Sequence, residues 1–193
     1  SFQGQIISTG DRVGGIVGAG YISDSGPDTP TVEIHNCYVD ATIKGNDKVG
    51  GLIGSEEGAH NFSDTDNGYG VKGALSVSDN HFYGKLEANG SNVGGILGYV
   101  YDFTKKSGDA TNFYLDSCGA NSAVGGAKTN TLVGVEKYGE AASKEAFSDG
   151  TILTKLNASN TSYLNWEMNA SKTYPIISDA AVVTSLSIEG EYK

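Results

Sequence analysis

The sequence has only one arginine, three prolines among 193 residues and no long apolar run. The low proline content excludes collagen and proline-rich linkers. The 28 glycines must therefore serve tight turns or positions where two backbone segments approach closely. Lysine and arginine number 13 against 23 acidic residues, a formal net charge of -10 at pH 7. This negative field makes nucleic acid and anionic membranes poor partners. Without the roughly 20 consecutive apolar residues of a membrane helix, no membrane insertion is expected.

A glycine-rich string occurs three times, as VGGIVG at 13–18, VGGLIG at 49–54 and VGGILG at 93–98. An aromatic residue, Phe2, Tyr38 or Phe82, precedes the last glycine of each string by 16 positions. These blocks therefore align without gaps, and the variation in length falls between them. Self-similarity at such a period indicates a stacked repeat architecture within one domain.

The repeated blocks predict extended structure. Residues 32–45 and 75–90 are rich in β-branched and aromatic residues, with apolar residues alternating over short runs. We expect an all-β fold, a parallel β-solenoid (right-handed β-helix-like) of about three to four coils with long loop excursions and a short C-terminal helical and strand cap. A recurring turn then needs either positive φ or a missing Cβ in a crowded seam, which fits Gly14, Gly15, Gly50, Gly51, Gly94 and Gly95.

The same alignment places Cys37 and His81 at equivalent positions, with Cys118 in a further coil. We expect a short polar ladder at Asn36 and Asn80 beside a stacked column of Cys37, His81 and Cys118. Two coil spacings, about 10 Å, exceed the roughly 7 Å limit for a disulfide, so both thiols are expected to be reduced and buried. Metal binding by the three residues is the alternative to a simple core role for the cysteines.

The combination of the glycine string at 49–54 with I-x-N-C-Y-x-x-x-x-I-x-G at 34–45 resembles the GLUG-motif repeats of bacterial surface proteins. Such repeats occur in non-catalytic regions of immunoglobulin A protease-like proteins and in large secreted proteins of gut bacteria. The resemblance implies a secreted or cell-surface location. Two departures stand out: TNTLVG at 129–134 lacks both glycines, as expected of a degenerate last coil, and His81 replaces the usual cysteine.

Three segments follow from these patterns. Residues 1–142 are expected to hold the GLUG-type solenoid repeats, 143–180 a capping segment, and 181–193 a linker or the start of an immunoglobulin-like module. Within the cap, Asp149 is the expected N-cap of a helix over 151–156, whose apolar stripe of Ile152, Leu153 and Leu156 would close the open end of the solenoid.

The long arms between blocks are the expected place for binding, because loops on a rigid scaffold carry most sites. Aromatic residues on or beside them suit glycan or protein recognition, or pack the arm onto the solenoid wall: Tyr21, Tyr69, Tyr99, Tyr101 and Phe103. Asp64, Asp66 and Asn67, with Glu56 and Glu57 nearby, resemble the oxygen spacing of calcium loops. The distal glutamate of a full calcium loop is missing, so the alternative is a solvated acidic turn. No other cofactor is expected.

Enzyme signatures are lacking. The sequence contains no H-E-x-x-H, G-x-S-x-G or C-x-x-C, and Arg12 alone cannot supply the basic cluster of β-helix polysaccharide lyases. We therefore expect a non-catalytic structural or adhesive module of a large exported bacterial surface protein. Its partners would be the flanking domains of the same polypeptide and a host or environmental glycan or protein. The alternatives are a carbohydrate- or protein-binding module that uses the arms, with calcium assisting, and a fragment of a carbohydrate-active enzyme.

Overall fold

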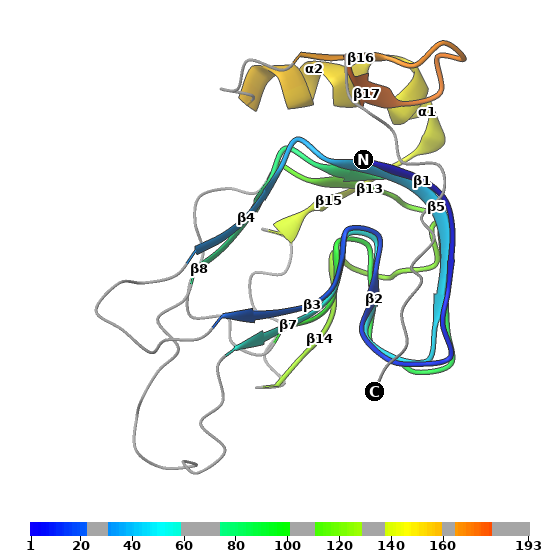
Figure 1. The fold of residues 1–193 in the computed structure, drawn as a ribbon. Coiled ribbons are helices and arrows are strands. Elements are labelled where there is room, and N and C mark those ends of the chain that lie inside the picture. Colours follow the sequence, from blue (N-terminus) through cyan, green and yellow to red (C-terminus); the bar gives the residue numbers. More distant parts are fainter. Residues whose placement is uncertain (23–30, 59–73, 101–110, 129–137, 160–164, 179–193) are drawn as a thin grey trace, which may run out of the picture.

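The computed structural model describes residues 1–22, 31–58, 74–100, 111–128, 138–159 and 165–178. The first four of these ranges form four stacked passes of the chain, here called coils one to four. Figure 1 looks along the stack, so that equivalent strands of successive coils superimpose. The fold is the predicted all-β parallel solenoid with short C-terminal helices.

The largest sheet runs through every coil and forms one outer side of the stack. Its strands are all parallel and lie in the order β1 (Phe2–Ile7), β5 (Tyr38–Gly45), β9 (His81–Phe82), β13 (Phe113–Leu115) and β15 (Glu140–Ala142), with β10 (Lys85–Ala88) also paired to β5. Because β1 and β5 bend sharply near their middle, the sheet turns a corner (Figure 1).

Three smaller parallel sheets complete the coils. The first contains β2 (Val13–Gly14), β6 (Val49–Gly50) and β11 (Val93–Gly94). The second contains β3 (Val17–Ile22), β7 (Ile53–Gly58), β12 (Leu97–Val100) and β14 (Val124–Ala127). The third pairs β4 (Thr31–His35) with β8 (Ala74–Ser78). In Figure 1 the first two sheets form a re-entrant hairpin that fills the middle of the coil.

The register between coils differs by one residue from the gapless alignment of the repeats. Val13 pairs with Val49 and Val49 with Val93, as that alignment requires. Phe2, however, pairs with Val39 rather than Tyr38, and Val39 pairs with Phe82. The expectation of insertion-free blocks is therefore wrong for coil two, whose turn between the corner strand and the glycine string is one residue shorter than those of coils one and three.

The glycine pairs are required by close packing and not by positive φ. A Cβ on Gly15, Gly51 or Gly95 would lie closer than 3.0 Å to the side chain at the facing interior position, which is Val39, Phe82 and Tyr114 in turn. A Cβ on Gly14, Gly50 or Gly94 would approach the backbone of the re-entrant hairpin as closely. Among the described glycines, positive φ occurs at Gly4, Gly119 and Gly150, outside this seam. Of the two explanations left open by the sequence, the crowded seam is the one that holds.

A buried asparagine ladder marks the corner after β4 and β8, although its members differ from those expected. Asn80 and Asn112 are fully buried, and the Asn80 amide donates to Ile34 O at 2.8 Å and to Asn112 Oδ1 at 2.9 Å. Asn112 in turn donates to Val77 O and Tyr138 O. Asn36 lies one position earlier, in left-handed conformation with φ 52, so it belongs to the turn and not to the ladder.

The expected column of Cys37, His81 and Cys118 does not form. The Cys37 backbone N–H binds Asn80 Oδ1, and His81 pairs with Tyr38 and with Phe113. Cys118 lies beyond the corner, where its carbonyl accepts from Leu86 N at 2.6 Å. The one-residue difference in turn length moves His81 past Cys37. Both cysteines are free; Cys118 is fully buried and Cys37 only partly.

Coil four ends the stack with a shortened path. Val124 pairs with Leu97, so VGGA of β14 occupies the place of LGYV in coil three and not that of its glycine pair. The segment 129–134, expected to hold the degenerate fourth string, lies outside the described residues. The chain between β13 and β14 instead crosses the interior, where Cys118, Ala120 and Ala123 are buried against coil three.

The C-terminal elements cover the side of the stack. α1 (Lys144–Ser148), α2 (Thr151–Ser159) and the hairpin of β16 (Trp166–Met168) and β17 (Pro175–Ile177) lie over β1, β5 and β13 in Figure 1. The N-cap residue of α2 is Gly150 and not the expected Asp149, because the Gly150 carbonyl accepts from Thr154 N at 2.9 Å. The Asp149 side chain, one position earlier, accepts from Thr151 N at 2.8 Å, and Ile152 and Leu156 are buried. The helix therefore packs on the outer face of the large sheet and does not close the end of the solenoid, as its stripe was expected to do. None of the described helices is long and apolar enough to span a membrane.

Candidate functional site

A polar groove lies where the large sheet turns its corner, and we call it the corner groove. It has a volume of about 580 Å³, within the range of roughly 300–1,000 Å³ typical of ligand sites. Its floor is a column of small residues, Gly4, Ala41 and Gly84, contributed by coils one to three. Small residues are needed at the bend because a Cβ on Gly84 would strike the Ala41 carbonyl. The same residues keep the groove shallow and continuous across three coils.

One wall of the corner groove is formed by Gln3, Asp40 and Tyr83. The three residues occupy one column, because Gln3 pairs with Asp40 and Tyr83 N binds Val39 O. Tyr174 of the C-terminal layer holds Asp40 and Gln3 in place. Its hydroxyl donates to Asp40 Oδ2 at 2.7 Å and accepts from Gln3 Nε2 at 2.5 Å. The C-terminal layer thus orders a site on the repeats.

The Tyr83 ring contacts two other rings. Its centroid lies 4.8 Å from that of Tyr174 and 5.2 Å from that of Phe147, the latter edge to face. Burial, with the nearby Asp40 carboxylate, raises the pKa of both Tyr83 and Tyr174. Both hydroxyls therefore stay protonated at neutral pH, and a half-buried, immobilised ring lines the groove.

The opposite wall carries positive charge. Thr42 and Lys85 pair across coils two and three, and Leu115 and Lys144 close the groove at its coil-four end. Lys85 also binds Glu87 at 2.8 Å, which lowers the pKa of that carboxyl. Lys144 has no carboxylate partner among the described residues. The lining therefore combines hydroxyl, amide, carboxylate, ammonium and aromatic groups.

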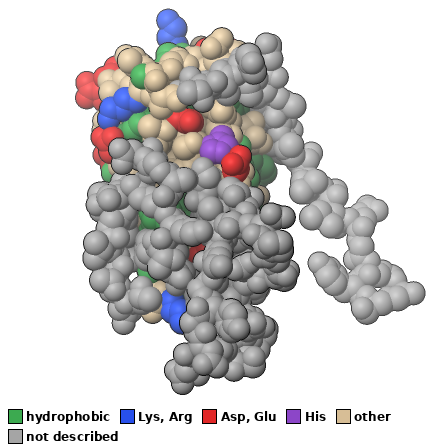
Figure 2. Space-filling model, turned by 90° about the vertical axis from the view of Figure 1, so that its left-hand side faces the viewer, with side chains coloured by type: hydrophobic (Ala, Val, Ile, Leu, Met, Phe, Trp, Pro, Cys, Tyr) green, Lys and Arg blue, Asp and Glu red, His purple; other side chains and the backbone are tan. Residues whose placement is uncertain are grey.

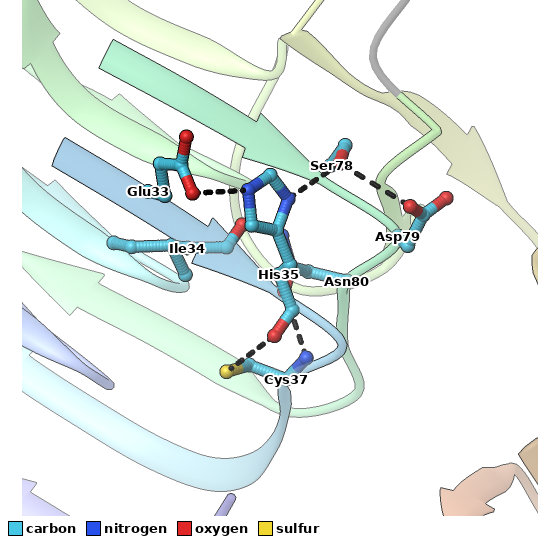
Figure 3. A network of polar contacts seen from close by, with 7 residues as sticks. All are labelled: Glu33, Ile34, His35, Cys37, Ser78, Asp79 and Asn80. Atoms are coloured by element: carbon cyan, nitrogen blue, oxygen red, sulfur yellow. Dashed lines mark hydrogen bonds and ion pairs between the residues drawn. The ribbon is translucent and has the colours of Figure 1, made fainter. Parts of the chain in front are cut away.

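A second polar cluster, the His35 network, lies on the opposite side of the coils at the ends of β4 and β8 (Figure 3). His35 Nδ1 lies 2.7 Å from Ser78 Oγ, and His35 Nε2 lies 3.6 Å from Glu33. Ser78 Oγ donates to Asp79 Oδ2 at 3.2 Å. Figure 2 shows a histidine side chain beside an acidic one on this face.

The His35 network connects several elements of the fold. His35 and Ser78 are Cα partners in neighbouring strands, so their contact follows directly from the stacking. The Ser78 hydroxyl thus lies between His35 Nδ1 at 2.7 Å and Asp79 Oδ2 at 3.2 Å. Asp79 also accepts from Thr111 and from Ser159 at the end of α2. The network therefore joins three elements of the fold.

Neither thiol has the character of a nucleophile. Burial raises the pKa of both Cys37 and Cys118 above the ordinary thiol value, so each is protonated at neutral pH. Among the described residues, no three histidine, cysteine or acidic side chains lie close enough together to hold a metal ion. For Cys37, His81 and Cys118 this agrees with their separate positions in the register.

The aromatic residues predicted for binding fall mostly on segments that the structure does not describe. Tyr69, Tyr101 and Phe103 lie outside the described residues, and for Tyr21 only the backbone, within β3, is described. Tyr99 is partly buried on β12, with Lys48 Nζ 4.4 Å from its ring centroid. This packing matches the alternative in which an aromatic residue lies against the solenoid wall.

The residues predicted for calcium are likewise only partly visible. Asp64, Asp66 and Asn67 lie outside the described residues, and Glu57 is described only as a backbone position of β7. Glu56 is buried within the stack, at 6% exposure, and Val100 of coil three pairs with it.

Sequence reasoning missed the residues of the corner groove. Gln3, Asp40 and Tyr83 share one column, but the column has no common residue type, and the gapless alignment had matched Asp40 with Gly84. Lys144 and Tyr174 come from outside the repeats. The detectable signal was the recurrence of glycine at Gly4 and Gly84, nine positions before the valine of the first and third glycine strings.

Comparisons with known proteins gave no match among family models, curated proteins or solved structures.

Proposed function

We propose that the chain is a non-catalytic module of a large exported bacterial surface protein, where it serves as a stiff adhesive scaffold. The observation that carries this proposal is the locked parallel stack: equivalent residues pair from coil to coil, and the glycine seam leaves no room for slippage. A one-residue slip would reverse the inward and outward faces of every strand. Such a stack holds surface residues of successive coils at fixed spacing, which suits an extended binding face.

The exported bacterial setting is supported by the resemblance of the glycine string and its preceding strand to GLUG-motif repeats. The large negative charge fits a protein that avoids nucleic acid and anionic lipid. The buried, protonated thiols need no disulfide partner, so the fold does not depend on the redox state of its surroundings.

The non-catalytic role is supported by the polar clusters of the described residues. The His35 network joins the coils to α2, because Asp79 accepts from Ser78 of β8 and from Ser159 of α2. The corner groove holds one carboxylate, and Tyr174 already donates to it. Polysaccharide hydrolysis ordinarily needs a pair of carboxyl groups facing the scissile bond.

One experiment tests both whether the protein binds a polymer and whether it cleaves it. Biotinylated protein on beads is incubated with mucins, plant and bacterial polysaccharides and extracellular matrix proteins. Bound polymer and released reducing ends or peptides are then measured. The proposal predicts that at least one polymer is retained and remains intact. Released products would contradict the non-catalytic role, and failure to retain any polymer would contradict the adhesive role.

A second candidate, a carbohydrate- or protein-binding module that uses the arms with calcium assisting, remains a proposal for the segments outside the described residues. Its test is calorimetric titration of the metal-free protein with calcium. Heat that disappears on Asp64→Asn with Asp66→Asn would support it, and the absence of heat would contradict it.

A further inference from the structure

We infer that the corner groove binds a saccharide chain that carries carboxylate groups, such as a polyuronate. This inference rests on the proposed non-catalytic binding role and names the ligand class of one site. The groove runs across coils one to three, so successive sugar units would meet successive coils.

The aromatic wall supplies a platform for a sugar ring. Tyr83 is half-buried, and its ring contacts both Tyr174 and Phe147, so binding would cost little side-chain entropy. The apolar C–H face of a pyranose packs well on such a ring, whose neighbours then bond the hydroxyl groups. Gln3 and Asp40 stand beside the ring in the same column and are held by the Tyr174 hydroxyl.

The polar groups match a hydroxylated ligand better than a peptide. Asp40 can accept from sugar hydroxyls. Gln3 and Thr42 can both donate and accept, as vicinal hydroxyls require. No apolar pocket for peptide side chains is formed, since the floor consists of Gly4, Ala41 and Gly84.

The cations favour a carboxylated sugar over a neutral one. Lys85 and Lys144 line the groove of a protein whose net charge is -10. Lys144 is exposed and has no carboxylate partner among the described residues, so an anionic ligand would gain a charge-assisted contact there without breaking an ion pair. Lys85 shares its charge with Glu87 and would contribute less.

The test is nuclear magnetic resonance titration of the isotope-labelled full chain with short oligogalacturonate and, separately, with its fully methyl-esterified form. The ester keeps the rings and hydroxyls and removes the charge. We expect amide shifts at Gln3, Thr42 and Gly84 with the acid, and binding at least about ten-fold weaker for the ester. Equal affinity for the two forms, shifts that map elsewhere, or no shifts at millimolar ligand would overturn the inference.

Two matched variants separate the groove from general electrostatics. Lys144→Gln should weaken acid binding about three- to five-fold, the range expected of one exposed charged contact, and leave the ester unchanged. Lys128→Gln removes the same charge after β14, outside the groove, and should change nothing. Equal weakening by both variants would show only non-specific attraction. New anomeric signals during the titration would contradict the non-catalytic function, whereas loss of binding here with retention on another polymer would contradict the groove alone.

Discussion

At the scale of single residues, stability depends on the glycine seam, where the packing leaves no room for a Cβ atom. Gly51→Ala would place a methyl group against both the Gly95 carbonyl and the Phe82 ring. Because backbone cannot move aside as a flexible side chain does, we expect a loss of about 3 kcal/mol or more in the free energy of unfolding, at the upper end of overpacking effects. Urea denaturation followed by circular dichroism measures it.

The matched control is Gly20→Ala in β3, where a Cβ would meet no atom within 4 Å. There the loss of glycine flexibility in the unfolded chain should leave stability unchanged or raised by less than about 1 kcal/mol. Similar destabilisation by both substitutions would mean that the seam is not a packing constraint.

His81 makes stability depend on pH. It is fully buried, and its Nε2 donates to Pro175 O at 2.6 Å, which joins the C-terminal hairpin to the large sheet. Burial lowers the pKa of His81 from 6.5 to about 4, so the folded state resists the proton that the unfolded chain accepts. Its contribution is fully present above pH 6.5 and is lost as pH falls through about 4, by roughly 3 kcal/mol in all.

The pH prediction is tested by difference, since carboxyl groups titrate in the same range. His81→Phe keeps an aromatic ring among Tyr38, Phe147 and Trp166 but cannot be protonated. The free energy of unfolding of the variant should fall less steeply than that of the wild type between pH 6.5 and about 4. Parallel curves would show that His81 is not the group responsible.

At the scale of elements, the asparagine ladder joins the corners of successive coils. Asn112→Leu keeps the volume but removes donors to two buried carbonyls and an acceptor for Asn80. Leaving such groups unpaired costs about 1–3 kcal/mol each, so we expect a loss of at least about 3 kcal/mol by denaturant unfolding. Asn89→Ala, at an exposed turn with one 3.4 Å contact, is the control and should have almost no effect. A small effect of Asn112→Leu would contradict the ladder.

The strands, their parallel stacking and the glycine seam could be predicted because every coil needs the same residue types at the same positions. The exact pairing could not, because the turn 46–48 is one residue shorter than the turns 9–12 and 89–92, and the motifs on either side do not show it. Asn36 and Asn80 therefore looked equivalent while only Asn80 joins the ladder. Likewise Val124 to Gly126 imitate the glycine string yet occupy another place, since coil four cuts across the interior.

The candidate site was less predictable than the fold. The corner groove depends on Lys144 at its coil-four end and on Tyr174, which reaches from the C-terminal layer to Asp40 of coil two; no local pattern encodes a contact across more than 100 positions. The floor, by contrast, is visible in the sequence as the recurring glycines Gly4 and Gly84.

At the scale of the whole molecule, the two ends of the stack differ. Coil four buries the interior of coil three, whereas coil one leaves its own interior partly open: Ile16 is 37% exposed, while the equivalent Leu52 and Ile96 are fully buried. The edges of β1, β2 and β3 on that side have no pairing strand among the described residues. Open edges beside apolar residues favour association with another chain.

We expect weak self-association through this end, strongest at high salt, where repulsion from the net charge of -10 is screened. Ile16→Asp should reduce the association constant several-fold in analytical ultracentrifugation. Ile7→Asp adds the same charge to the outward face of β1 and should have a smaller effect, although Ile7 is 70% exposed. If Ile7→Asp reduced association more than Ile16→Asp, the contact would involve the side of the stack.

The register of the stack is tested most directly by cysteine cross-linking across neighbouring coils, in a background with Cys37→Ser and Cys118→Ala. Thr42 and Lys85 are Cα partners, whereas the gapless alignment of repeats would place Leu86 opposite Thr42. Adjacent parallel strands lie about 4.8 Å apart, within the roughly 4.4–6.8 Å that a disulfide tolerates. The account predicts rapid oxidation of Thr42→Cys with Lys85→Cys and slow oxidation of Thr42→Cys with Glu87→Cys. Equal rates, or no bond in the first pair, would contradict the stacked parallel register.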